Sequence, residues 1–309
     1  MKLLKALLAI AVVLLGGVAQ ANDNTLRIVA SFPPGSGPDS LARKVAEQLS
    51  DQLNVPVIVE NKPGGNGVVA MNYALGQKDN NVILYASNDN MVVYPLLIND
   101  QNLVNKFRPL KQAMYSDLML AVSPAVNYIN ALKQNKNISY GSWSVGSAPH
   151  ILGSSFGQFL GATSSVHVPY KDYGQWFGDV SSGTLTFSFV TVGSTGPLEK
   201  SGKIKYLATA GANRNPRYPN LPTLQELTGQ SFYGIGWAGF YVPIGTSGVR
   251  EKKLKAALDQ VFARKEVVEI LDVLSYTYQK LSADQFRQFV QQDQKKFQEA
   301  LRTNNIKLD

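Results

Sequence analysis

The 309-residue sequence contains no cysteine and only two histidines, His150 and His167. Without cysteine the chain can form no disulfide, no thiolate metal site, no Cys-ligated iron–sulfur cluster and no thiol nucleophile. Two imidazoles also exclude a metal site built from several histidines. A site that combines one histidine with carboxylates stays open.

Charged residues are sparse, at 17%, and 30 Lys plus Arg against 22 Asp plus Glu give a formal net charge of +8. This excess is spread along the whole chain, so composition gives no reason to expect nucleic acid as a partner. The length, with 44% hydrophobic residues, allows a sizeable core in one large domain or two medium ones.

A long apolar run occurs only at the start of the chain. Two lysines precede an apolar run over residues 6–18, and Ala19-Gln20-Ala21 supplies a small-x-small cleavage pattern. This order predicts a cleaved secretory signal peptide over residues 1–21. The run is shorter than the ~20 residues of a membrane-spanning helix. Export and the lack of cysteine together favour a bacterial periplasm.

After residue 22, short apolar runs alternate with segments of helical periodicity. The first strand is predicted at 26–31, and the helix after it has Asp39 as its expected N-cap. Strands separated by helices of ten or more residues require crossover connections, which predicts an α/β fold with mostly parallel sheets. The other predicted strands are 55–60, 82–86, 119–122, 138–140, 166–168, 186–189, 206–210 and 240–242. The other predicted helices are 68–75, 129–134, 149–160, 249–263, 265–274 and 283–302.

Two loops each follow a predicted strand and precede a predicted helix. The first is residues 32–38, rich in Gly and Pro, and the second is residues 141–150, rich in Ser and Gly. Free N–H groups and the positive dipole end at a helix start favour a small anion. Because open α/β sheets bind ligands at the carboxyl ends of their strands, two facing lobes could hold one anion from both ends.

Two short motifs suggest other functions. Gly35-Ser36-Gly37, with Glu60 ending the next strand, imitates a dinucleotide-binding fingerprint, but Ser40 stands at its third glycine and an exported protein meets no NAD pool. Residues 153–157 match G-x-S-x-G of the α/β-hydrolases. That motif needs a strand-to-helix turn, whereas here the surrounding apolar spacing predicts a helix. An exported hydrolase using Ser155 remains the alternative from another class.

Several segments resemble the tripartite tricarboxylate transporter receptor family, the TctC-like or Bug-type extracytoplasmic solute-binding proteins. The marks are RIVASFPPGSGPDSLARKVAEQL, VPVIVENKPGGNG, ISYGSWSVGSAPH, HVPYKDYG, YPNLPTLQEL and GWAGFYVPIGT. The resemblance implies a type II periplasmic-binding-protein-like fold with a cleft between two lobes. The lobes would be residues 22–123 with 240–309, and 124–239. It further implies a monomer without cofactor or enzymatic activity that passes a small carboxylate to a membrane permease.

The resemblance assigns carboxylate binding to the two loops, with weaker candidates nearby. The candidate ligand-binding residues are Phe32, Pro33, Pro34, Gly35, Ser36, Gly37, Asp39, Asn61, Gly65, Ser87, Asn88, Ser142, Ser144, Gly146, Ser147, His150, Tyr170 and Thr191.

The chain also departs from the family pattern. Ser36 stands where a glycine is usual, and Val190 and Thr191 stand where relatives that take amino acids can carry an acid for the ammonium group. We therefore expect a di-, tri- or aromatic carboxylate without an amino group. A receptor-fold protein that serves as a sensor partner is a further alternative.

Overall fold

The computed structural model describes residues 24–77, 81–232 and 234–304, so the predicted signal peptide lies outside the described residues. The strands are β1 (Leu26–Ala30), β2 (Val57–Asn61), β3 (Val82–Ser87), β4 (Phe107–Val122), β5 (Asn137–Ser142), β6 (Ser164–Pro169), β7 (Phe187–Thr191), β8 (Lys205–Thr209) and β9 (Ile235–Pro243). The helices are α2 (Gly37–Leu53), α3 (Val68–Leu75), α4 (Tyr94–Leu97), α5 (Ile129–Leu132), α6 (Ala148–Phe159), α7 (Tyr173–Ser182), α8 (Val192–Lys200), α9 (Leu224–Thr228), α10 (Gly248–Val261), α11 (Lys265–Val273) and α12 (Ala283–Asn304). Short helical turns are η1 (Gly65–Gly67), η2 (Asp89–Val93) and η3 (Val104–Lys106).

The strands form one curled sheet in the order β2-β1-β3-β9-β4-β7-β5-β6, with β8 also pairing with β4. The predicted α/β fold is confirmed, but the sheet is mixed rather than mostly parallel. Parallel pairs lie toward its two ends, where helices connect β1, β2 and β3 and likewise β5, β6 and β7. The pairs that β9 and β4 make in the middle are antiparallel.

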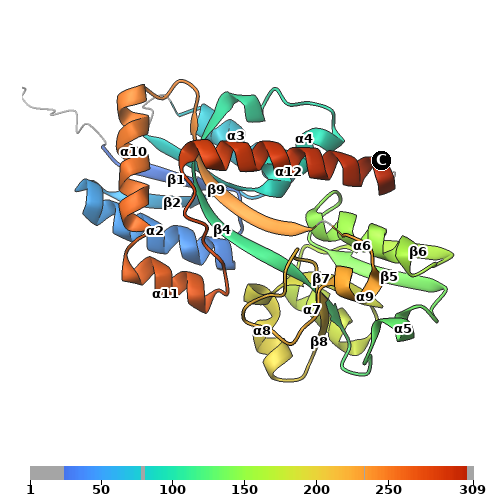
Figure 1. The fold of residues 1–309 in the computed structure, drawn as a ribbon. Helices are drawn as coiled ribbons and strands as arrows, with labels where there is room; N and C mark the ends of the chain where they lie inside the picture. The colour runs from blue at the N-terminus through green and yellow to red at the C-terminus, as the bar shows by residue number, and fades with distance from the viewer. Residues whose placement is uncertain (1–23, 78–80, 233, 305–309) are drawn as a thin grey trace, which may run out of the picture.

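Strand β4 runs through both halves of the molecule. Its residues up to Asp117 pair with β9, and from Leu118 onward they pair with β7 and β8 (Figure 1). We call the part built on β1, β2 and β3 with α2, α3, η2, α4, α10 and α11 the first lobe. The part built on β5 to β8 with α5 to α9 is the second lobe. The sequence predicted only the end of β4, because its earlier residues include the buried Lys111 and Gln112 and show no alternation.

Helix α2 begins one turn earlier than predicted. Ser36, not Asp39, is its N-cap: the Ser36 side chain accepts a hydrogen bond from the Asp39 N–H at 3.3 Å. The Asp39 carboxylate lies in the first turn, where it complements the helix dipole, and it is 2% exposed. Because Asp39 is turned inward, it organises the loop before the helix instead of capping it.

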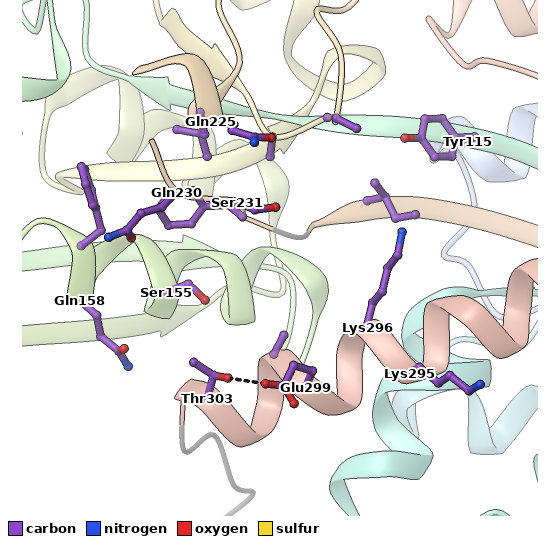
Figure 2. Close-up of a pocket in the computed structure, with 18 of the residues that line it drawn as sticks. Tyr115, Ser155, Gln158, Gln225, Gln230, Ser231, Lys295, Lys296, Glu299 and Thr303 are labelled. Atoms are coloured by element: carbon purple, nitrogen blue, oxygen red, sulfur yellow. Dashed lines mark hydrogen bonds between the residues drawn. The ribbon is translucent and has the colours of Figure 1, made fainter. Parts of the chain in front are cut away.

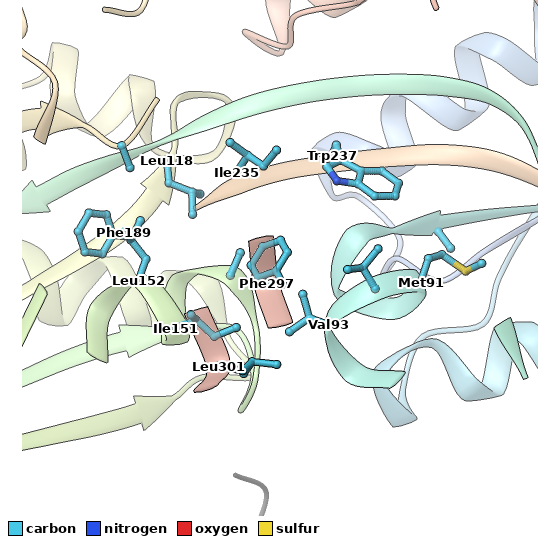
Figure 3. Close-up of a cluster of buried hydrophobic side chains, with 14 of the residues drawn as sticks. Met91, Val93, Leu118, Ile151, Leu152, Phe189, Ile235, Trp237, Phe297 and Leu301 are labelled. Carbon is cyan, nitrogen blue, oxygen red and sulfur yellow. The ribbon is translucent and has the colours of Figure 1, made fainter. Parts of the chain in front are cut away.

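The long C-terminal helix α12 joins the two lobes. Phe297 and Leu301 on this helix pack in one apolar cluster with Ile151 of α6, Val93 of η2 and Trp237 of β9 (Figure 3). The cluster thus contains side chains from both lobes and from a strand that connects them. Within the part of the chain that the structure describes, no helix has the length and apolar character needed to cross a membrane.

Candidate functional site

Asp39 is the centre of the first loop. Its carboxylate accepts hydrogen bonds from the Gly35 N–H (2.9 Å), Arg43 Nε (3.0 Å) and Asn61 Nδ2 (2.7 Å). Asn61 also donates to the carbonyl of Phe32 at 3.1 Å. Burial would raise the pKa of Asp39, but these donors outweigh burial and hold the pKa below its ordinary value. The carboxylate is therefore ionised at neutral pH. It holds the loop directly at Gly35 and, through Asn61, at Phe32.

Asn90, in η2, ties the first loop to the end of β3. Its Oδ1 accepts from Ser31 Oγ (2.7 Å), Ser87 N (3.2 Å) and Ser87 Oγ (3.0 Å). A Cβ on Gly67 would lie 2.6 Å from Asn90 Cγ, so glycine is required where the turn that also contains Gly65 passes this side chain. The side chain of the neighbouring Asn88 bonds to strand β9 instead: it donates to the Ile235 carbonyl and accepts from the Trp237 N–H.

The hydroxyls of the second loop bond to the loop itself. Ser142 and Ser147 are both fully buried, and each donates to the Ser144 carbonyl at 2.8 Å. The Gly146 N–H donates to Nδ1 of His150 at 2.8 Å. A Cβ on Gly146 would lie 2.0 Å from Leu97 of α4, so this loop touches the first lobe closely. The serine and histidine side chains thus shape the loop.

His150 and His167 form a stacked pair with ring centroids 3.8 Å apart. His167 Nε2 lies 2.7 Å from Ser142 Oγ, and the Tyr140 ring packs against both imidazoles. Burial lowers the pKa of His150 to about 4, and burial together with the neighbouring His150 lowers the pKa of His167 to about 3. Both rings are neutral near pH 7, so His150 supplies no positive charge for a carboxylate.

Asp89 connects the two lobes directly. This residue begins η2, and its carboxylate accepts from Trp143 Nε1 at 2.6 Å and from the Ala148 N–H at 3.0 Å. Ala148 is the first residue of α6, so the start of the helix that the sequence predicted as an anion site holds a carboxylate of the protein itself. Burial raises the pKa of Asp89 to about 6, with the two hydrogen bonds opposing that rise.

A third helix start lies between the lobes. Thr191 precedes α8 and shares a hydrogen bond with Ser194 at 2.8 Å, while a Cβ on Gly193 would lie 2.2 Å from the Leu274 carbonyl. Tyr276 contacts both this helix start and Gly37 at the start of α2. Tyr170 is buried, and its hydroxyl donates to Asp179 at 2.6 Å.

The structure therefore brings the first loop, the end of β3 and the second loop together through η2. Asn88 and Tyr170 are used in packing and hydrogen bonds within the protein. Sequence reasoning missed Asp89, Asn90 and Tyr276. Asp89 and Asn90 follow directly after the predicted Ser87 and Asn88 at a strand's carboxyl end, and this position could have identified them; no local signal marks Tyr276.

The described residues also line an open cavity of about 950 Å³ away from these loops. It lies between α6, α9, α12 and β4, with Gln158, Gln225, Lys295 and Lys296 in its wall (Figure 2). None of the predicted ligand-binding residues lines it. Helices α6 and α12 present later turns to this cavity. The five-residue α9 begins at its wall with Leu224 and Gln225, but a capping box of Thr223 and Glu226 already closes that helix start. We therefore favour the loops as the carboxylate site.

Ser155 lines this cavity, and among the described residues no histidine or carboxylate is hydrogen-bonded to its hydroxyl. It lies in the interior of α6, and its Oγ donates to the Ile151 carbonyl one turn earlier at 3.0 Å. The flanking glycines serve packing: a Cβ on Gly153 would lie 2.2 Å from the Tyr140 ring, and one on Gly157 would lie 2.7 Å from Ser165 Oγ. The predicted helix at the G-x-S-x-G motif is confirmed, so the motif is not a nucleophile elbow.

Comparison with known proteins identifies the family. Residues 41–306 match the family described as "Tripartite tricarboxylate transporter family receptor". The chain belongs to this receptor family. The predicted resemblance is thereby confirmed over most of the sequence.

Individual relatives are distant but cover nearly the whole chain. The protein BugT of Bordetella pertussis is 24% identical over 294 residues, which cover 92% of this chain and 90% of that protein. A solved "Structure of a periplasmic transporter" is 26% identical, covers 92% of this receptor and 98% of that chain, and has a TM-score of 0.79. The structure "R. palustris Rpa4515 with adipate" is 21% identical, and the match covers 92% of this receptor and 98% of that chain with a TM-score of 0.80. This likeness shows that the two proteins share the fold.

Proposed function

We propose that this receptor captures a small carboxylate in the periplasm by closing its two lobes and delivers it to a tripartite tricarboxylate-type permease. The observation that carries the proposal is the contact of Asp89 with the second loop. The Trp143 indole and the Ala148 N–H hold a carboxylate across the lobes, so this loop has the donors that such a ligand needs. The similarly folded protein solved with adipate supports the same ligand chemistry.

The first loop would hold the ligand mainly through its backbone. Asp39 and Asn61 are engaged with one another and with the loop, so they hold it in shape for the ligand. We retain the predicted residues of both loops as ligand-binding candidates, and residues 22–123 with 240–309 and 124–239 as the lobe limits. The protein would act as a monomer after cleavage of residues 1–21.

We also propose that the ligand lacks an amino group. At the end of β7, Val190 is buried and Thr191 is paired with Ser194, so this strand end offers no acid for an ammonium ion. Binding without catalysis fits the environment of Ser155, whose hydroxyl is bonded within its own helix. Both the end of β7 and the bonded Ser155 hydroxyl are features of the protein alone, so these two arguments hold whichever carboxylic acid is the ligand.

A thermal-shift panel tests this function. The protein covering residues 22–309 is unfolded and refolded to remove carried-over ligand, then mixed with mono-, di-, tri- and aromatic carboxylates. A ligand at ten times its dissociation constant adds ~1.4 kcal/mol of stability. That corresponds to a rise of roughly 3–5 °C in melting temperature. We expect a selective rise with carboxylates; a natively refolded protein that responds to none of them, or equally to the matched amides, would show that the function is wrong.

A further inference from the structure

Asp89 is a buried carboxylate without a positive partner. It is 7% exposed, and among residues 24–77, 81–232 and 234–304 no lysine, arginine or histidine forms an ion pair with it. Its two hydrogen bonds both come from the opposite lobe. A buried charge that is held by two donors alone is costly, so its position calls for a functional explanation.

The donors that Asp89 uses are the ones that a ligand would need. The next residue of α6, Pro149, has no N–H, and the Gly146 and Ser144 N–H groups donate to His150 and to Ser142 Oγ. A second carboxylate at this place would have to displace Asp89 or lie beside it. Two carboxylates in one such place repel each other strongly, and one of them must then take up a proton.

We propose that Asp89 determines specificity by filling the second-lobe carboxylate site, so that the ligand of this receptor carries a single carboxylate, held at the first lobe. This inference rests on the proposed function and narrows its ligand class. The far end of the ligand would then face the partly exposed Trp143, which packs on the buried Trp176 with ring centroids 6.0 Å apart, and would be uncharged. Such a surface suits an aliphatic or aromatic monocarboxylate.

Chain-matched pairs of acids test the inference. We would measure the dissociation constants of butanoate and succinate, hexanoate and adipate, octanoate and suberate, and benzoate and terephthalate by calorimetry. In the pair that binds most tightly, the wild type should bind the mono-acid at least tenfold better than the di-acid. Asp89→Ala, which opens the site, should lose or reverse this preference. Asp51→Ala, an exposed acid on α2, is the matched control and should keep it.

A second measurement does not depend on knowing the ligand. Formate should raise the melting temperature of Asp89→Ala more than that of the wild type or Asp51→Ala, because it can also occupy the vacated site, whereas formamide should stabilise none of the three. Asp89→Asn keeps the side-chain shape, so it covers the case in which the alanine variant does not fold. It should bind the di-acid better than the wild type does, because the repelling charge is gone.

The two possible failures are distinguishable. If the wild type binds both members of a pair equally, or if formate stabilises Asp89→Ala no more than it stabilises the wild type, the inference is wrong while the receptor function stands. If neither the wild type nor any variant binds any carboxylate, the proposed function itself is wrong.

Discussion

Replacing Gly153 with valine should lower the free energy of unfolding by about 3 kcal/mol or prevent folding altogether. The Cβ would lie 2.2 Å and 2.4 Å from two ring carbons of Tyr140. That ring cannot move away easily, because it is stacked on Phe187 with centroids 5.6 Å apart and also contacts His167. The helix must therefore shift from the sheet, which would open the core around α6. Urea unfolding followed by circular dichroism measures the change.

Two variants in the same measurement give the comparison. Gly178 is a helical glycine of α7 with nothing within 4 Å of its Cβ position, so Gly178→Ala should stabilise the protein by roughly 0.5–1 kcal/mol. Ser155→Ala should change stability little and should leave carboxylate binding intact. If Gly153→Val is as stable as the wild type, the close packing of α6 on β5 is wrong. Ester hydrolysis that disappears in Ser155→Ala would support the hydrolase alternative.

Acidification from pH 7 to pH 4 should destabilise the protein by roughly 2–3 kcal/mol through the stacked histidine pair. The pKa values of His150 and His167 fall from 6.5 to about 4 and about 3 in the folded protein, so the unfolded chain binds protons first. The stabilisation that depends on the neutral histidine pair is fully present above pH 6.5 and is lost as the pH falls toward 4. The pKa of Asp89 is raised from 3.8 to about 6, so its protonation offsets part of this loss. Denaturant unfolding across this pH range measures the slope.

Two variants assign the pH dependence. His167→Gln removes one of the two imidazoles and should reduce the loss between pH 7 and pH 4 by about half. Asp89→Asn removes the opposing contribution and should make the loss larger. A wild-type stability that is flat between pH 7 and pH 4, or a slope that His167→Gln does not change, would contradict the stacked neutral pair.

The first lobe was largely predictable because its signals are local. Apolar runs separated by amphipathic helices gave β1, α2, β2, α3 and β3 with ends close to those observed. The two loops that we propose as the carboxylate site could be located for the same reason, since each lies between a strand and a helix start. The prediction of Asp39 as the N-cap of α2 was wrong, because the N-cap is Ser36. Sequence alone could not choose between them, since serine and aspartate both suit a helix start.

The elements that depend on distant contacts could not be predicted in this way. Most of β4 is buried on both faces, and Lys111 is tolerated there because it pairs with Asp259 and lies 5.4 Å from the Tyr278 ring centroid. Helices α7 and α8 were missed because small and polar residues weaken their periodicity. Asp89 as the occupant of the second loop depends on two lobes meeting, and no pattern within one segment encodes that contact.

The most direct test of the account is the distance between the lobes with and without a carboxylate. Because the chain has no native cysteine, the exposed Val268 of α11 and Lys200 of α8 can be replaced by cysteine and spin-labelled in Val268→Cys/Lys200→Cys. Electron paramagnetic resonance then gives the distance distribution for the refolded protein. We predict that at least one carboxylate of the panel shifts the population saturably toward a single shorter distance, while the corresponding amide does not. A distribution that no carboxylate changes, or that the amide changes equally, would contradict a receptor that closes on a carboxylate.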